Sequence, residues 1–290
     1  MNYKQKQNPE LISLKPVSNG QRNRVVLHSK EITHRNKNIP HKPLLKKITR
    51  AVGINNQGRR TCETKVSGHK KQYRTIDFTR TKINIPGVVH QIEYDPFRTA
   101  NIALIHYADG EKRYILAAKN MIVGQKVISG ISEADCVLSS GNSTLIKNIP
   151  YGRAVHNIEL QPNSGAKICR AAGSSAIILA HDAATNRTKI LLPSKEIRTL
   201  SSECRATLGE VGNIFQSHVN VGSAGHNIKK GVKPTVRGSA KNTCDHPHGG
   251  GEGKQPIGRI PVNKNGKKVI QNTRIKKKFT NKFIVRKRTK

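Results

Sequence analysis

The segment spanning residues 237–254 gathers residue types that can act on protons, metals or phosphates. Two histidines, His246 and His248, flank a proline, and four of the five residues from 249 to 253 are glycine. Glycine reaches backbone angles closed to other residues, so this chain can lie flat against a large partner. Pro247 fixes its own backbone and favours an extended conformation at His246. The segment therefore predicts a shaped loop held open for contact.

Three kinds of active chemistry could in principle use this loop, and the sequence argues against each of them. The run His248-Gly-Gly-Gly resembles the oxyanion segment of some esterases, but the sequence lacks the Gly-x-Ser-x-Gly elbow that such enzymes need. A histidine acting as general base would have Asp245 as its only nearby acid. Cys244, His246 and His248 could bind zinc with Cys204 or His226, although the spacing matches no common structural zinc pattern. We therefore expect no enzymatic activity, no metal and no cofactor.

The charge of the chain indicates a polyanionic partner. The formal net charge is +36, from 53 Lys and Arg against 17 Asp and Glu. Residues 1–60 carry 14 basic side chains and residues 253–290 carry another 14, with no acid in the second segment. A chain of this kind repels itself in isolation, so nucleic acid is its natural counterpart.

The cysteines and the hydropathy pattern restrict the cellular compartments in which this protein is expected. The five cysteines are scattered and odd in number, which argues against a disulfide framework and for a reducing environment. The sequence has no apolar run of about 18 residues, so we expect no contact with a membrane. The N-terminus fits neither a secretory signal nor a transit peptide.

Short strands dominate the pattern from residue 73 onward, so we expect a mainly β protein. Residues 102–107 and 113–117 are apolar runs separated by Asp109-Gly110, which predicts a hairpin. Further strands are expected at residues 87–94, 121–124, 126–131, 154–160, 176–180, 188–192 and 196–200. Of these, 154–160 should alternate between faces and 176–180 should be buried on both. Their spacing suggests two small barrels in tandem.

This organisation predicts four parts. Residues 1–60 form a basic N-terminal arm, or alternatively a disordered tail; residues 61–128 and 129–200 form the two barrels; residues 201–290 form a basic, glycine-rich extension.

Three further segments carry residues suited to RNA. In the segment 68–78, Lys70, Lys71 and Arg74 can neutralise phosphates while Tyr73 stacks or binds a ribose, although a solvated strand end would look similar. Arg205 and Thr207 precede two glycines, a pattern that suits a phosphate but is also common in structural turns. The run 276–290 gains by counterion release on nucleic acid. Its alternative is a nuclear or membrane-surface patch, but the apolar residues there do not segregate from the charges.

Nine motifs in order along the chain make it resemble the universal large-subunit ribosomal protein two family. The most specific is Asp245-His-Pro-His-Gly-Gly-Gly-Glu-Gly253. The others are Gly68-His-Lys-Lys with Tyr73-Arg and Ile76-Asp-Phe78, Glu93-Tyr-Asp-Pro96, Asp109-Gly-Glu-Lys-Arg-Tyr-Ile-Leu116, Val155-His-Asn-Ile-Glu159, Arg170-Ala-Ala-Gly173, Cys204-Arg-Ala-Thr-Leu-Gly-Glu-Val-Gly-Asn213, Pro234-Thr-Val-Arg-Gly238 and Phe283-Ile-Val-Arg-Lys-Arg288.

The resemblance implies an oligonucleotide-binding-type barrel, then an SH3-like barrel, with long irregular basic extensions. It implies a structural protein that binds large-subunit ribosomal RNA and other large-subunit proteins, and that contacts the small subunit at the subunit interface. The extension would reach toward the peptidyl transferase centre during translation. The residues expected to contact rRNA are Gly68, His69, Lys70, Lys71, Tyr73, Arg74, Arg205, Thr207, Arg237, Gly238, His246, His248, Gly249, Gly250, Gly251, Lys254, Lys276, Lys277, Lys278, Arg286 and Arg288.

The chain also departs from the family pattern. Only one glycine precedes His69, Lys241 stands where methionine is usual, and the chain has no tryptophan. These departures suggest an organellar ribosome. Residues 192–198 and 256–259 resemble plastid and cyanobacterial members, and a plastid is favoured over a mitochondrion or the bacterial cytoplasm. A general DNA-compacting protein is the competing class of nucleic-acid binder.

Overall fold

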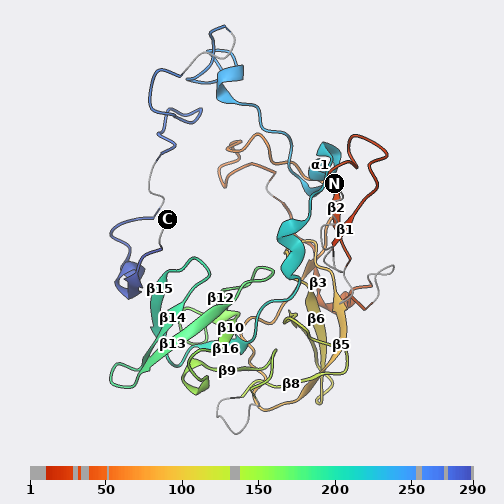
Figure 1. Cartoon of the computed structure of the whole chain (residues 1–290), viewed down its shortest axis with the longest axis vertical. Helices are drawn as coiled ribbons and strands as arrows, with labels where there is room; N and C mark the ends of the chain where they lie inside the picture. The colour runs from red at the N-terminus through yellow and green to blue at the C-terminus, as the bar shows by residue number, and fades with distance from the viewer. Residues whose placement is uncertain are drawn as a thin grey trace, which may run out of the picture. The chain divides into compact units, whose positions relative to one another are not determined.

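A computed structural model describes residues 11–28, 32–33, 39–50, 52–130, 138–252, 257–270 and 274–288 (Figure 1). These residues fall into two compact units. Unit 1 comprises residues 1–49, 71–222 and 282–290, and unit 2 comprises residues 50–70 and 223–281. The expected mainly β character is confirmed, and among the described residues the only α-helix is the seven-residue α1 (Ala224–Lys230).

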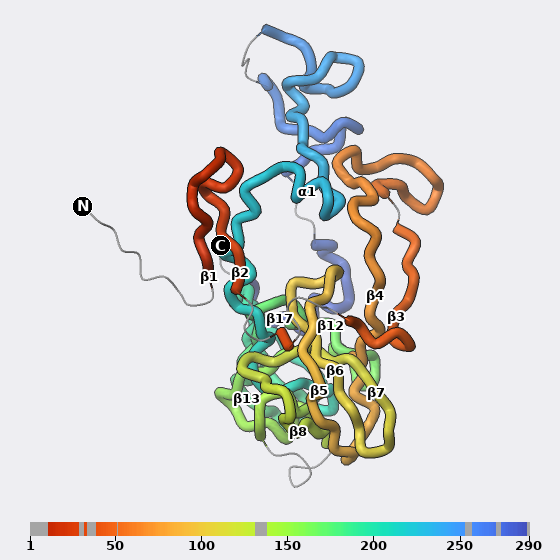
Figure 2. The backbone as a smooth tube through the Cα atoms, turned by 90° about the vertical axis from the view of Figure 1, so that its right-hand side faces the viewer, coloured from red at the N-terminus to blue at the C-terminus, as the bar shows by residue number. Residues whose placement is uncertain are grey.

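The first sheet of unit 1 has four antiparallel strands in the order β7-β6-β5-β8 (Figure 2). The strands are β5 (Gly87–Glu93), β6 (Ile102–Tyr107), β7 (Lys112–Leu116) and β8 (Lys126–Val127). The predicted Asp-Gly hairpin is confirmed as β6–β7, with Gly110 at φ +83° in the turn. A positive φ is strained for side-chain-bearing residues, so glycine allows the tight reversal.

Both faces of this sheet are covered. Val89, Ile105 and Ile115 belong to one buried cluster, while Ile102 and Tyr114 belong to a second. Successive strand residues point to opposite faces, so a strand with apolar residues at consecutive positions must be covered on both sides. The strand expected at 121–124 is wrong: Ile122 and Val123 are exposed and Gly124 has φ +87°, because the chain turns here into β8. Ile131, the end of the next expected strand, lies outside the described residues.

Tyr114 lies at the centre of a buried polar network. Its hydroxyl donates to Glu93 Oε1 at 2.8 Å and accepts the backbone N–H of His41 at 2.8 Å. The side-chain amide of Gln91 also donates to Glu93. Burial raises the pKa of the Tyr114 hydroxyl, so it stays protonated and able to donate. The network joins the residues before η1 (Lys42–Leu44) to the first sheet.

Replacing Tyr114 with phenylalanine is expected to lower the free energy of unfolding by about 2 kcal/mol, because the buried Glu93 and the half-buried His41 amide each lose a hydrogen-bond partner. Urea unfolding would measure the change. Tyr151→Phe is the control, since Tyr151 is 77% exposed, and it should change stability by less than about 0.5 kcal/mol. Equal effects of the two substitutions would contradict the role assigned to Tyr114.

The second sheet of unit 1 has seven strands in the order β17-β15-β14-β13-β10-β16-β9. Figure 1 labels all of them except β17, which is labelled in Figure 2. Two of them, β16 and β17, come from the sequence after residue 200. The strands are β9 (Ser143–Leu145), β10 (Ala154–His156), β13 (Ala176–Asp182), β14 (Arg187–Leu191), β15 (Ile197–Ser201), β16 (Arg205–Leu208) and β17 (Ile284–Arg286). The basic C-terminal segment is therefore anchored at the edge of this sheet by pairing with β15.

Two expectations for this sheet are corrected. The segment 154–160 does not alternate between faces, because Asn157 at φ +51° breaks it into β10 and β11 (Ile158–Glu159). The strand β13 is not buried on both faces: Ile178 is buried, but Ile177 is 39% and Leu179 is 40% exposed. One face of this sheet packs on the core, so only every second residue is covered. The core comprises Ile146, Ile149, Val155, Ile158, Ala176, Ile178, Ile190, Leu200, Cys204, Ala206 and Leu208.

Small ladders complete both units. In unit 1, β1 (Leu11–Ser13) pairs with β2 (Val25–Leu27), β3 (Leu45–Lys46) pairs with β4 (Tyr73–Arg74), and β11 pairs with β12 (Ala166–Ile168). In unit 2, Lys65 bridges to Val232.

Within the described ranges, no helix is both long and apolar enough to cross a bilayer.

Candidate nucleic-acid interface

Two of the residues predicted to contact RNA lie beside an aromatic ring in unit 1. Tyr73 packs edge-on against Phe97, with ring centroids 5.5 Å apart, and Lys71 Nζ lies 6.0 Å from the Phe97 ring. Arg74, the next predicted residue, is instead buried, with Nη1 donating to the carbonyl of Gln72 at 2.9 Å. This stretch therefore offers a ring and a cation at its surface and a structural arginine beneath.

Arg98 extends the same surface. The guanidinium lies 5.7 Å from the ring centres of both Tyr73 and Phe78. The fully buried Asp95 positions it, accepting the Arg98 Nε–H at 2.7 Å and the backbone N–H of Phe97 at 2.8 Å. A carboxylate that holds both residues places the cation and the ring in one geometry.

Arg170 approaches Phe78 from the β12 side of the unit. Its guanidinium lies 4.8 Å from the Phe78 ring centre, within the range of a cation–π contact. Arg170 is exposed, and no carboxylate in the described part of the chain forms an ion pair with it. We call Tyr73, Phe78, Phe97, Arg98 and Arg170 the aromatic–arginine cluster.

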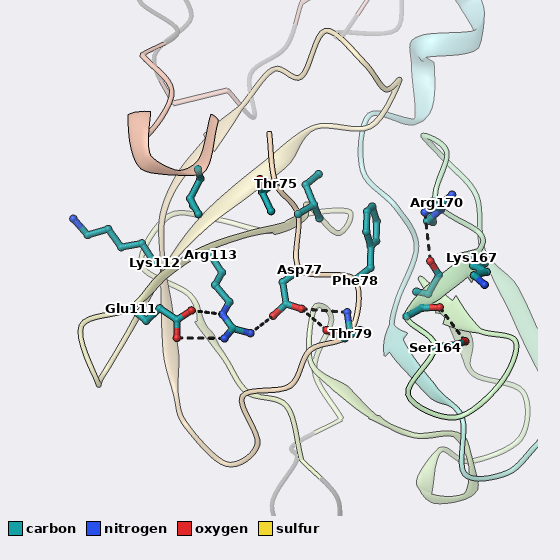
Figure 3. A pocket seen from close by; sticks show the side chains of 14 residues that line it. Thr75, Asp77, Phe78, Thr79, Glu111, Lys112, Arg113, Ser164, Lys167 and Arg170 are labelled. Atoms are coloured by element: carbon teal, nitrogen blue, oxygen red, sulfur yellow. Dashed lines mark hydrogen bonds and ion pairs between the residues drawn. The ribbon is translucent and has the colours of Figure 1, made fainter. Parts of the chain in front are cut away.

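A cavity of about 510 Å³ opens beside Phe78 and Arg170 (Figure 3). Its walls come from residues 75–79 after β4, the start of β7, the residues in and just before β12, and Leu44 of η1, and Figure 3 shows Asp77 between Arg113 and Phe78. The lining residues are Leu44, Thr75, Ile76, Asp77, Phe78, Thr79, Glu111, Lys112, Arg113, Ser164, Gly165, Ala166, Lys167 and Arg170. This volume lies within the range of small-molecule and nucleotide sites.

The charge in this cavity is unevenly compensated. Arg113 Nη1 pairs with Asp77 at 2.9 Å and Arg113 Nε pairs with Glu111 at 2.7 Å. Burial acts to raise the pKa of Asp77, but hydrogen bonds from Arg113 and from the Arg80 backbone hold it below its usual value. Both acids therefore pair with Arg113, while no described carboxylate pairs with Lys112, Lys167 or Arg170, so these three cations can meet an anion.

The remaining predicted residues of unit 1 do not join this cluster. Arg205 is half-buried, with Nη1 3.3 Å from the Arg80 carbonyl, and Thr207 is buried between β9 and β10. Arg286 and Arg288 are exposed at the C-terminal end, where Arg286 lies in β17.

In unit 2, Gly68 lies where only glycine fits. An added Cβ would come 2.6 Å from the backbone of Gly231, and Gly68 has φ +60°. The next residue, His69, donates its backbone N–H to the Lys229 carbonyl at 2.8 Å. Lys70 is exposed. The segment 64–69 is thus held against residues 229–233 by backbone contacts.

The glycine segment of unit 2 is folded by close backbone approach. The turn η4 (Gly238–Ala240) lies under the His246 ring, and Arg237 beside it is exposed. An added Cβ on Gly249 would meet the Asn242 carbonyl at 2.1 Å, and Gly250 and Gly251 have positive φ. Lys276, Lys277 and Lys278 are exposed, and Lys254 lies outside the described residues.

Among the described residues of this unit, Glu63 forms two ion pairs. Its two carboxylate oxygens lie 2.8 Å from Lys241 Nζ and 2.8 Å from Lys264 Nζ. Hydrogen bonds from Lys241 and Lys264 lower the pKa of Glu63 to about 2. Lys241 is thereby paired within the chain, in contrast to Lys70, which forms no ion pair with a carboxylate of the described residues.

Two family models match this chain. Residues 41–129 match "Ribosomal Proteins L2, RNA binding N-terminal domain", and residues 139–266 match "Ribosomal Proteins L2, C-terminal domain". The chain belongs to the L2 family of ribosomal proteins. An L2 protein is a structural constituent of the large ribosomal subunit that binds rRNA and resides on the ribosome among other ribosomal proteins. The expected fold class, an oligonucleotide-binding-type barrel followed by an SH3-like barrel, is confirmed.

The structure of this L2 chain also bears on the zinc-site and hydrolase hypotheses for the histidine loop. Cys204 is buried in the core of unit 1, whereas Cys244, His246 and His248 belong to unit 2. Across the described ranges, no group of three or more His, Cys, Asp and Glu side chains is placed to hold a metal ion. The L2 family is a family of structural ribosomal proteins, so membership in it does not support the hydrolase hypothesis.

Reasoning from sequence did not single out Arg98 or Phe97 in this L2 chain, and it used Phe78 and Arg170 only as parts of family motifs. A local signal exists for Arg98, because Asp95 lies three residues before it and forms the charge-assisted bond that positions it. The approach of Arg170 to Phe78 joins residues 92 positions apart, and no local pattern encodes it.

Proposed function

We propose that the aromatic–arginine cluster and its cavity hold an unstacked nucleotide of large-subunit rRNA. The observation that carries this proposal is the approach of two guanidinium groups to the Phe78 ring, beside a cavity lined by three cations that pair with no described carboxylate. Single-stranded RNA is bound by stacking bases on aromatic rings and arginine planes while cations contact the phosphates. A base stacked at Phe78 and a phosphate near Lys167 and Arg170 would use each of these groups.

We also propose that the other sequence-predicted residues at the surface contact rRNA, and that the backbone of the glycine segment in unit 2 does so near the peptidyl transferase centre. The buried Arg74 and Thr207 would instead support the strands that carry them. The support is the Asp245–Gly253 motif and the exposure of Arg237 and of Lys276–Lys278. Phosphate contacts would position the chain and the glycine backbone would provide shape complementarity. By the same resemblance, the protein supports association with the small subunit, and its ribosome is that of a plastid.

The four-part organisation is retained as part of this proposal. Residues 61–128 and 129–200 form the two barrels, while residues 1–60 and 201–290 form extensions. The extension after residue 200 would then contribute β16 and β17 to the sheet of the second barrel.

Two substitutions would separate phosphate binding from stacking. Arg170→Ala is expected to reduce the slope of log affinity against log salt concentration by about one, because one phosphate contact is lost. Phe78→Leu is expected to weaken binding roughly tenfold or more without changing that slope, since stacking contributes ~1–3 kcal/mol per base. Filter binding of the full chain to a folded large-subunit rRNA transcript, over a series of salt concentrations, would measure both.

Arg170→Lys is the matched control, because it keeps the charge and should keep the slope. Duplex DNA at the same salt concentrations tests the competing class of function. Equal affinity for duplex DNA and rRNA, with no effect of Phe78→Leu, would contradict nucleotide binding at the cluster and support general DNA compaction.

A further inference from the structure

The two histidines of the glycine segment both accept hydrogen bonds from the backbone. His246 Nδ1 accepts the backbone N–H of His248 at 3.0 Å, and His248 Nε2 accepts the backbone N–H of Val262 at 2.8 Å. An imidazole nitrogen accepts a hydrogen bond only when it carries no proton. The neutral His246 ring therefore has its proton on Nε2, and the neutral His248 ring has its proton on Nδ1.

These bonds connect three separate parts of unit 2. The His246 ring lies on the η4 turn so closely that a Cβ on Gly238 would come 2.4 Å from its Cε1 atom. The His248 ring is tilted against it, with centroids 5.1 Å apart, and holds Val262, which bridges to Lys268. Backbone bonds from Gly249 N–H to the His246 carbonyl at 2.8 Å and from Gly250 N–H to the Lys241 carbonyl at 3.0 Å complete the fold. The histidines therefore sit at the junction of the η4 turn, the glycines and the 262–268 hairpin.

The remaining ring atoms of His248 are poorly placed for an outside ligand. Its protonated Nδ1 is buried and has no hydrogen-bond partner within the described chain. The pKa of His246 is lowered by partial burial and by electrostatic repulsion from His248, Lys241 and Arg259, which favours the neutral ring. A group that must stay neutral and accept a backbone bond is poorly suited to transfer protons.

We propose that His246 and His248 are positioning residues whose acceptor nitrogens fold the glycine segment. The proposal deepens the RNA contact proposed above and rests on it for one readout only, the affinity for rRNA. In this arrangement the surface offered to RNA is the backbone of Gly249–Gly251 together with Arg237, and the rings act through that backbone.

The test replaces each histidine by an amide side chain whose oxygen lies either at the position of the acceptor nitrogen or away from it. The side-chain oxygen of asparagine can take the place of a histidine Nδ1, and that of glutamine the place of Nε2. In the full chain, His246→Asn and His248→Gln keep the acceptor, whereas His246→Gln and His248→Asn move it. Hydrogen exchange at single amides, measured on RNA-free protein, reports each bond separately. His226→Asn and His226→Gln are controls within the same unit.

We expect exchange at the His248 amide to rise roughly tenfold in His246→Gln but not in His246→Asn, as the loss of one hydrogen bond predicts. Exchange at the Val262 amide should rise similarly in His248→Asn but not in His248→Gln. Equal exchange within either pair would overturn the proposal. Loss of folding in the two variants that keep the acceptor would also overturn it, because the acceptor alone should suffice.

Affinity for the folded rRNA transcript then separates this proposal from the RNA contact. The variants that keep the acceptor should bind like the wild type, and those that move it should bind roughly tenfold more weakly. If exchange follows the expected pattern while all four variants bind normally, the positioning role stands and the RNA contact of this segment falls. If affinity drops in variants whose amides stay protected, the rings themselves contact RNA and the proposal is overturned.

Discussion

Replacing Glu159 with alanine is expected to lower the free energy of unfolding by about 4 kcal/mol, the larger of the two strongest effects predicted for this chain. The Glu159 carboxylate is buried in β11 and accepts three backbone N–H groups, from Gly165 at 3.0 Å, Arg205 at 3.0 Å and Asn163 at 3.2 Å. Alanine would leave the Gly165 and Arg205 amides without an acceptor. Each buried amide left unpaired costs ~1–3 kcal/mol in addition to the lost charge-assisted bond.

Urea unfolding of two further variants would define the cause. Glu203→Ala removes an exposed carboxylate with the same change in net charge and should cost less than about 0.5 kcal/mol. Glu159→Gln keeps one acceptor oxygen and should fall between wild type and Glu159→Ala. If Glu159→Ala were as stable as Glu203→Ala, the carboxylate would not hold this turn.

Substitution of Glu159 should also weaken binding at the proposed nucleotide site. Glu159 fixes the turn that contains Ser164 and Gly165, and both of these residues line the cavity. We therefore expect the affinity for rRNA to fall in Glu159→Gln even under conditions where the variant is folded, because the cavity wall is less well held.

Acid should destabilise the protein through His156, the second large effect. This ring is fully buried and its Nδ1–H donates to the Gly209 carbonyl at 2.9 Å, while Nε2 is buried without a partner in the described chain. Burial lowers the pKa of His156 to about 4, below the ~6.5 of an unfolded histidine. A lowered pKa in the folded state means that stability is fully present above pH ~6.5 and is lost as the pH falls toward 4. The total loss is about 3 kcal/mol.

Comparison with His156→Asn would isolate this contribution. Asparagine can still donate to the Gly209 carbonyl but does not titrate, so the fall in stability between pH 7 and pH 4.5 should be about 2 kcal/mol smaller in the variant. Urea unfolding at both pH values gives the difference, in which the acids that titrate in both proteins cancel. An identical fall in the two proteins would contradict the role of His156.

Local patterns in the sequence predicted the strands because their signals are short-range. The Asp109-Gly110 turn with apolar runs on both sides specified the β6–β7 hairpin, and strands were expected correctly at β5, β13, β14 and β15. The same reasoning failed at residues 121–124, where apolar residues occupy a turn, and at β13, where Ile177 and Leu179 are exposed. Apolar composition alone does not say which face of a strand is covered, because coverage depends on the distant segments that pack against it.

Charge, composition and ordered motifs were enough to establish the mainly β class, a polyanionic partner and membership in the L2 family, since each of these is written in residue types and short spacings. Tertiary structure alone brought Arg98 and Arg170 to Phe78, placed three backbone amides on Glu159 and gave His246 and His248 their acceptor roles. The physical reason is distance along the chain. Contacts between segments tens of residues apart are selected by the packing and hydrogen bonding of the whole unit, which local propensity does not encode.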